Sequence, residues 1–176
     1  MPVEFARLRD ELVQLIESDR HLLIGAKALI QYTRPRFTQD TDYAVEQRVF
    51  RRVRKWFRDH ADAVSFEDVG EALRCPPLAI DVVNATNHPV RLEVIRHENG
   101  LPSPEGLAAF KYVAMTSLTR PRTERIQDFA DFSRLVVLDA FDIAKLTAYL
   151  VDPYDAQRDE VTRLIADIRA GRPVQI

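Results

Sequence analysis

The sequence is poor in the residues and segments that mark several classes of protein. It contains one cysteine, Cys75, so no internal disulfide can form, and no spaced set of Cys and His predicts structural zinc. No apolar run approaches the roughly 20 residues needed to cross a bilayer, and the first residues, MPVEFARLRDEL, lack the layout of a signal peptide. We therefore expect a soluble, cytoplasmic protein that makes no membrane contact.

The charge balance shows no basic excess either. The 25 Lys and Arg residues are matched by 27 Asp and Glu, for a net charge of −2, so any contact with nucleic acid has to be local. A 46% apolar content over 176 residues is enough for one hydrophobic core. We predict an N-terminal α/β core over residues 1–100, with a C-terminal helical part over residues 101–176 packed on it.

Hydrophobic periodicity predicts a few strands among many helices. Expected strands are HLLI, which ends at Gly25, DTDYAV from Asp40, and LAIDVVN from Leu78 to Asn84. Helical spacing predicts helices over residues 5–16, 26–32, 46–60, 89–97, 104–118, 126–137, 142–150 and 153–170. The expected fold class is α/β (α+β), a small mixed sheet flanked by helices, with a C-terminal helical bundle.

Three carboxylates are the strongest candidates for a functional site. Asp40 and Asp42 are two residues apart in a predicted strand, so their side chains would share one face within about 7 Å of each other. Two anions this close favour a divalent cation such as Mg²⁺ between them, and Asp81 on a neighbouring strand would complete a site for one or two metals. An Asp-x-Asp pair alone is common in proteins, so ordinary surface carboxylates are the competing interpretation.

Five pieces of sequence, in order along the chain, carry a family resemblance. LIGA, YTRPRFTQDTDYAV and LAIDVV resemble the pattern of the DNA polymerase beta-like nucleotidyltransferases: a strand ending in glycine, a helix, an Asp-x-Asp strand and a third Asp on a later strand. SPEGLAAFKYVAM and RTERIQDFADF resemble the C-terminal helical motif of the AbiEii-like toxin branch. The resemblance spans residues 22–132 and implies a sheet of nucleotidyltransferase type.

The resemblance implies a role for each matching residue. Asp40 and Asp42 match the metal-binding pair, and Asp81 matches the third carboxylate, which helps to activate the acceptor hydroxyl. Lys111 matches a helical lysine that reaches the triphosphate or the metal site. Asp128 matches the first aspartate of the last motif, whose second aspartate could equally belong to a structural ion pair with a nearby arginine, Arg125.

The glycine turn before the second motif is the expected phosphate site. Gly25 lets the backbone approach phosphate, and Ala26 stands where the family has glycine or serine, so no side-chain hydroxyl is available there. Lys27, in the first turn of the following helix, would offer a positive charge to the phosphates or lie in solvent.

The resemblance also implies an activity. The expected enzyme uses Mg²⁺ or Mn²⁺ to move a nucleoside monophosphate from a nucleoside triphosphate to an RNA end, such as that of tRNA, or to a protein hydroxyl. It would be the toxin of a toxin–antitoxin pair, with an antitoxin protein as partner. One alternative is a nucleotidyltransferase acting on a small molecule such as an aminoglycoside, and another is an inactive binding module, towards which Ala26 points.

The sequence does not decide the role of two groups of arginines. The helix predicted over residues 46–60 has a basic outer side, which either follows an RNA backbone or is a solvated surface. Arg34 and Arg36, just before the Asp pair, either touch substrate or are loop charges.

Overall fold

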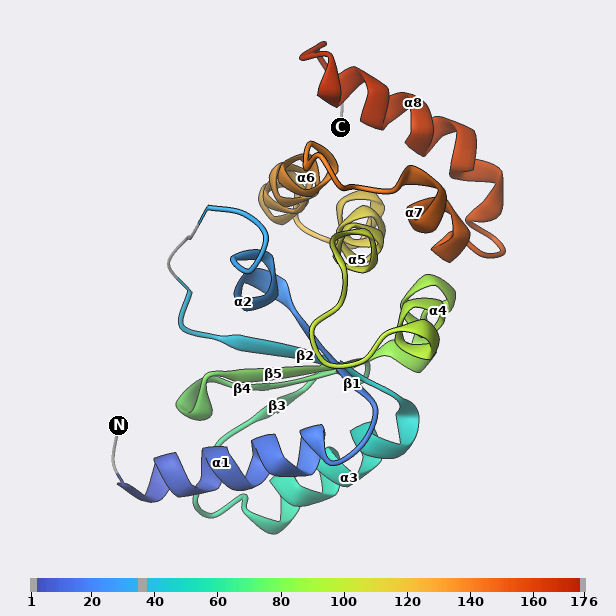
Figure 1. The fold of residues 1–176 in the computed structure, drawn as a ribbon. Helices are drawn as coiled ribbons and strands as arrows, with labels where there is room; N and C mark the ends of the chain where they lie inside the picture. The colour runs from blue at the N-terminus through green and yellow to red at the C-terminus, as the bar shows by residue number, and fades with distance from the viewer. Residues whose placement is uncertain (1–2, 35–37, 175–176) are drawn as a thin grey trace.

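A five-stranded mixed sheet lies between two layers of helices (Figure 1). The computed structural model describes residues 3–34 and 38–174. The strands are β1 (His21–Ile24), β2 (Thr41–Val45), β3 (Glu67–Asp68), β4 (Ala72–Cys75) and β5 (Ile80–Asn84).

The order of strands in the sheet is β1-β2-β5-β4-β3. β2 and β5 are parallel, whereas the three other pairs are antiparallel. A parallel pair needs a long crossover connection, and here the chain passes through a helix and the β3–β4 hairpin before β5 joins β2. The two strands with the candidate carboxylates are therefore direct neighbours in the centre of the sheet.

One face of the sheet is covered by α1 (Val3–Glu17) and α3 (Gln47–Asp59), and we call it the α3 face (Figure 1). Apolar residues at helical spacing on both helices pack against the alternate residues of the strands that point the same way. The fully buried members include Leu12, Phe50, Phe57, Ile80 and Val82.

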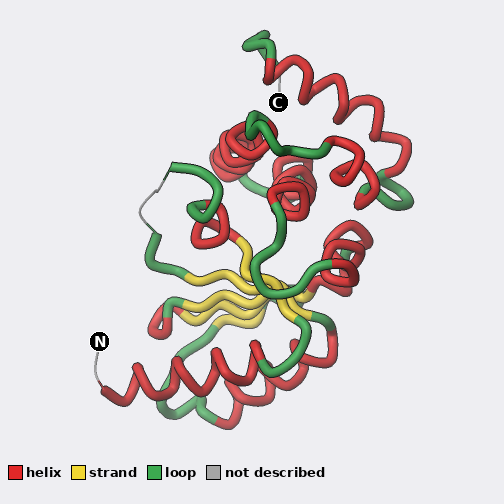
Figure 2. Tube along the Cα trace, in the orientation of Figure 1, coloured by secondary structure: helices red, strands yellow, loops and turns green. Residues whose placement is uncertain are grey.

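The opposite face, which we call the α5 face, is covered by α2 (Gly25–Leu29), α4 (Pro89–His97) and α5 (Pro104–Thr116). Outside them lies a further layer, formed by α6 (Arg122–Val136), α7 (Ile143–Tyr149) and α8 (Arg158–Arg169) (Figure 2). Short 3₁₀ turns lie at Pro76–Leu78, Ala85–Asn87 and Asp155–Gln157.

The second core cluster joins the two parts of the chain that the sequence suggested. It contains Leu22 of β1 together with Leu107 of α5 and Ile165 of α8. One hydrophobic core therefore contains residues from both sides of the boundary predicted at residue 100. Over the described ranges, every helix is too short or too polar to span a membrane.

The prediction from the sequence missed two strands and placed the start of two others wrongly. β3 and β4 were not expected, and Cys75 is a fully buried residue of β4. The strand predicted from Leu78 begins only at Ile80, because the chain first makes a 3₁₀ turn and Ala79 then has a φ of 51°. The strand predicted from Asp40 begins at Thr41.

The helical predictions are confirmed in position but not at every end. α5 ends at Thr116, so Leu118 does not continue its apolar face and is 91% exposed. α6 begins at Arg122, earlier than predicted, and α8 begins at Arg158, later than predicted. The predicted caps are present: Ser103 accepts from the Gly106 N–H at 3.2 Å, and Asp142 accepts from the first N–H groups of α7.

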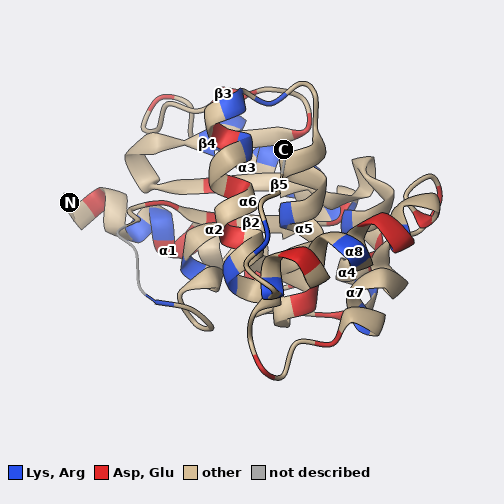
Figure 3. Ribbon diagram, turned by 90° about the horizontal axis from the view of Figure 1, so that it is seen from above, with Lys and Arg blue, Asp and Glu red and all other residues tan. Residues whose placement is uncertain are grey.

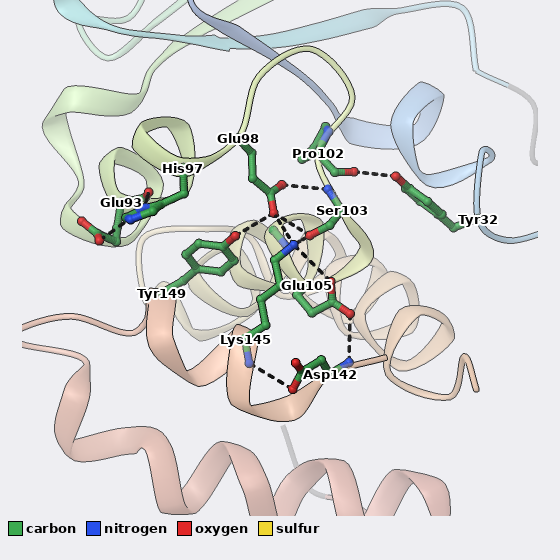
Figure 4. A network of polar contacts seen from close by, with 11 residues as sticks. Tyr32, Glu93, His97, Glu98, Pro102, Ser103, Glu105, Asp142, Lys145 and Tyr149 are labelled. Atoms are coloured by element: carbon green, nitrogen blue, oxygen red, sulfur yellow. Dashed lines mark hydrogen bonds and ion pairs between the residues drawn. The ribbon is translucent and has the colours of Figure 1, made fainter. Parts of the chain in front are cut away.

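A carboxylate at the end of α4 joins three helices (Figure 4). Glu98 accepts hydrogen bonds from the Ser103 N–H at 2.7 Å and the Ser103 hydroxyl at 2.6 Å, and from the Tyr149 hydroxyl at 2.6 Å. Lys145 Nζ lies 3.0 Å away. Burial alone would raise the pKa of Glu98, but these donors outweigh burial and lower it. The ionised carboxylate therefore fixes the α4–α5 turn against α7.

Candidate functional site

Asp42 and Asp81 lie side by side on the α5 face of the sheet. They are Cα partners in the parallel β2–β5 pair, and neighbouring strands run about 4.8 Å apart. Tyr43 and Val82, the next residues along the two strands, belong to the α3-face core, so the carboxylates point the other way. The sequence prediction that Asp42 and Asp81 share a face is confirmed.

Gly25 makes room for the Asp42 carboxylate. β1 ends at Ile24, the Cα partner of Asp42, and Gly25 follows with a φ of +66°. A Cβ at position 25 would lie 2.7 Å from Cγ of Asp42, much closer than atoms can approach. The glycine predicted from its strand-to-helix position is therefore required both by its backbone conformation and by the carboxylate next to it.

Asp40 lies outside the strand pair, in the segment just before β2, and its side chain is exposed. Its charge still acts on Asp81. Burial raises the pKa of Asp81, the charges of Asp40 and Glu67 raise it further, and Arg74 opposes them. Asp40 is thus electrostatically coupled to Asp81, although it does not stand beside Asp42 on a shared strand as expected.

The arrangement offers two neighbouring carboxylates to a cation. Among residues 3–34 and 38–174, no three His, Cys, Asp or Glu side chains are grouped closely enough to hold a metal ion. Mg²⁺ is commonly bound by one or two carboxylates plus the phosphate oxygens of a substrate. Asp42 and Asp81, held in register beside a glycine that admits close approach, fit this mode of binding.

Two cations stand at the edge of the sheet where β2 begins. Lys27 of α2 donates to the Thr41 hydroxyl at 2.5 Å, and Arg9 of α1 donates to the same oxygen at 3.2 Å. Burial and the Arg9 charge lower the pKa of Lys27, whereas Asp40 and Asp42 act in the opposite direction. Lys27 is therefore an electrostatic neighbour of the carboxylates, and its position agrees with the one expected from the sequence.

Lys111 is engaged in a buried ion-pair cluster between α5 and α6. Its Nζ lies 2.9 Å from Asp128 and 2.8 Å from Asp131, which are 5% and 0% exposed. Arg120 lies 3.1 Å from Asp128. The partners of Asp131 include Lys111, and Arg134 at 3.6 Å, so Asp131 does take part in structural ion pairs.

The basic side of α3 is remote from the carboxylates. α3 packs on the α3 face, whereas Asp42 and Asp81 point to the α5 face. Four of its cations are paired with acids of the same chain: Arg48 and Arg52 with Asp19, Arg54 with Asp68, and Lys55 with Asp59. This supports the interpretation of a solvated helix face. Arg34 is exposed, and Arg36 lies outside the described residues.

The sheet is less covered on the side of β3 and β4. Seen from above, β3 and β4 lie to one side of α4, α7 and α8, and basic and acidic positions are interspersed along the ribbon (Figure 3). Arg74 of β4 is the Cα partner of Asp81, and its side chain is 56% exposed. Arg74 is thus the cation next to Asp81, and Lys27 is the cation next to Asp42.

Sequence reasoning missed Arg9, Thr41 and Arg74. Arg74 was missed because β4 was not predicted. Arg9 contacts Thr41 across 32 positions of sequence, and a helical arginine carries no local signal of such a contact. Thr41 stands between the two aspartates of the motif, which was the one available hint.

Comparison with known proteins adds no relative. No protein-family model matches the chain, and none of the curated proteins gives a significant match. Function is therefore inferred from the residues of the site and their geometry.

Proposed function

We propose that this chain is a divalent-metal-dependent nucleotidyltransferase of the DNA polymerase beta-like type, which moves a nucleoside monophosphate from a nucleoside triphosphate to a hydroxyl acceptor. The observation that carries the proposal is the pairing of Asp42 with Asp81 in register beside Gly25. The five sequence pieces that resemble this class include all three residues.

In this proposal the carboxylates have separate roles. Asp42 and Asp81 hold the metal, and Asp40, at the exposed mouth of the site, adds negative charge to it. Asp81 also positions or deprotonates the acceptor hydroxyl, a role helped by a pKa above the ordinary carboxyl value. Bound Mg²⁺ or Mn²⁺ would supply neutralisation of the triphosphate and activation of the hydroxyl.

The nucleotide is expected along the turn after β1. Ala26 is buried and has no hydroxyl, so in this proposal the phosphate contacts in the turn come from main-chain N–H groups and from Lys27. Lys111 is the further lysine that the resemblance assigns to the triphosphate or the metal site. In the structure its amine is bound by Asp128 and Asp131, so its proposed part is to hold these helices in place and balance charge.

The acceptor class rests on the resemblance to the AbiEii-like toxins. An RNA end, such as that of tRNA, or a protein hydroxyl is the proposed acceptor in the cytoplasm, and an antitoxin protein is the proposed partner. Because α3 packs on the opposite face of the sheet and four of its cations are paired with acids, the proposed RNA contact does not involve α3.

The test is transfer of label from each of the four α-labelled nucleoside triphosphates, with Mg²⁺ or Mn²⁺, to total RNA, to cell protein and to an aminoglycoside. We expect RNA or protein to be labelled by the parent and not by Asp42→Asn. Asp59→Asn, which alters an exposed acid of α3, is the matched control and should label like the parent. Equal labelling by Asp42→Asn would contradict the assignment, and label on the aminoglycoside alone would replace the acceptor class.

A further inference from the structure

Arg9 and Lys27 converge from opposite layers of the fold on one hydroxyl. Arg9 comes from α1, on the α3 face, and Lys27 from α2, on the α5 face. Both donate to Oγ1 of Thr41, and Arg9 Nε also donates to the Leu78 carbonyl at 3.3 Å. Both side chains are half-buried, so the two charges are held in place at the edge of β2 and only partly solvated.

These two cations are short of acceptors. A lysine has three donors and an arginine five, whereas a hydroxyl oxygen accepts with two lone pairs, both of which are used here. Within the part of the chain that the structure describes, neither Arg9 nor Lys27 has a carboxylate within 4.0 Å. The hydroxyl satisfies hydrogen bonds but does not neutralise charge.

Two like charges next to each other are unfavourable without an anion. Burial and, after it, the Arg9 charge lower the pKa of Lys27, as expected for two cations that share one hydroxyl oxygen. The charges of Asp40 and Asp42 oppose this effect, so the two carboxylates are electrostatic neighbours of Lys27. An anion of high charge density, bound between the cations and next to a carboxylate-held metal, would relieve both repulsions.

We propose that Arg9, Lys27 and the edge of β2 at Thr41 form a polyphosphate-binding site, which takes the β- and γ-phosphates of the nucleoside triphosphate and holds the pyrophosphate that leaves. The inference rests on the proposed function for the identity of its ligand. It adds Arg9, a residue of the N-terminal helix, to the binding residues. It also assigns the triphosphate to the start of β2, at Thr41.

The test is isothermal titration of inorganic tripolyphosphate into the full chain, with and without Mg²⁺. Arg9→Gln and Lys27→Gln should each weaken binding about tenfold or more, as expected for loss of a charge-assisted hydrogen bond. Arg9→Lys keeps the charge and should retain most of the affinity. Arg7→Gln removes a 67% exposed arginine of the same helix and should bind like the parent.

Protein stability separates a binding role from a structural one. Thermal melts without ligand should show Arg9→Gln and Lys27→Gln unchanged or slightly more stable, because each removes one of two repelling charges. Tripolyphosphate should raise the melting temperature of the parent and of Arg7→Gln, but much less that of Arg9→Gln. Parent-like tripolyphosphate affinity in both Gln variants would overturn the inference, as would an absence of tripolyphosphate binding by the parent.

The inference and the proposed function can fail separately. If the parent binds tripolyphosphate through Arg9 and Lys27 but labels no acceptor, the anion site stands and the transferase activity falls. If the parent labels RNA or protein while Arg9→Gln and Lys27→Gln bind tripolyphosphate normally, the activity stands and the anion site falls.

Discussion

Gly25 and Asp42 occupy space that cannot be shared with a side chain at position 25. The glycine has a φ of +66°, and a Cβ built on it would overlap the Asp42 carboxylate, with Cγ at 2.7 Å. The turn after β1 and the carboxylate of β2 therefore constrain each other. Any residue other than glycine would strain the backbone and displace the carboxylate.

Gly25→Ala should lower stability more than a left-handed backbone alone explains. Gly70 is the matched control, since its φ is +85° and nothing lies within 4 Å of its built Cβ. Gly70→Ala should cost about 1–2 kcal/mol of unfolding free energy, the ordinary penalty for an L-residue in this region. Gly25→Ala should cost about 2–4 kcal/mol because it adds the clash. Urea unfolding measures both, and equal losses would mean that Asp42 moves aside freely.

Asp81→Asn should stabilise the metal-free protein at neutral pH. The folded-state pKa of Asp81 is raised by burial and by Asp40, so the folded protein binds this proton more tightly than the unfolded chain does. Its contribution is fully present below the unfolded carboxyl pKa of about 3.9 and is lost as pH rises through the folded value. The gain from Asn should therefore be seen at neutral pH and disappear below about pH 4.

Mg²⁺ should reverse this order. An ion held by Asp42 and Asp81 stabilises the folded parent by mass action. In Asp81→Asn the ion has one carboxylate ligand fewer, so Mg²⁺ should stabilise this variant less. Urea unfolding with and without Mg²⁺ measures the difference, with Asp59→Asn as control. If Mg²⁺ shifts the parent and Asp81→Asn equally, Asp81 is not a ligand.

Lys111→Met should cost about 3 kcal/mol of unfolding free energy, because it leaves Asp128 and Asp131 buried without their shared cation. Lys55→Met removes a 76% exposed partner of Asp59 and should cost less than about 0.5 kcal/mol. Denaturant unfolding of both variants measures the contrast. A Lys111→Met protein of parental stability that no longer transfers nucleotide would show that Lys111 acts on the substrate and not on the helices.

His88 should make the protein lose stability at mildly acidic pH. Burial, helped by the Arg91 charge, lowers the pKa of His88 to about 4, and its ring lies 3.0 Å from the Tyr154 hydroxyl. A depressed histidine pKa contributes stability above the unfolded value of about 6.5, and this is lost as pH falls towards 4. The unfolding free energy of His88→Gln should therefore change less with pH in this window than that of the parent. His97 is exposed, so His97→Gln should show the same pH dependence as the parent.

The carboxylate pair was predictable because it depends on alternation within strands. Successive side chains of a strand point to opposite faces of the sheet. Asp42 and Asp81 therefore lie on the face opposite to Tyr43 and Val82, whichever other strands are present. Asp40 obeys the same alternation in sequence. It nevertheless lies outside the strand, because the pairing of β2 with β5 begins at Thr41, and the sequence does not show where a partner ends.

The rest of the site depends on contacts between distant segments. β3 and β4 have two and four residues, too few for periodicity to distinguish them from a loop. Arg74 and Arg9 reach the site only through the pairing of β4 with β5 and the packing of α1 under β2. Neither residue belongs to a local motif, so only a structure brings them to the carboxylates.

Glu98 has a mechanical consequence for the helices above the sheet. Its carboxylate is hydrogen-bonded by the start of α5 and by α7, and it packs against Gly106, where a Cβ would lie 2.5 Å from Oε2. We expect α4, α5 and α7 to move together as one rigid body at neutral pH. These three helices would then not close over a ligand independently of one another.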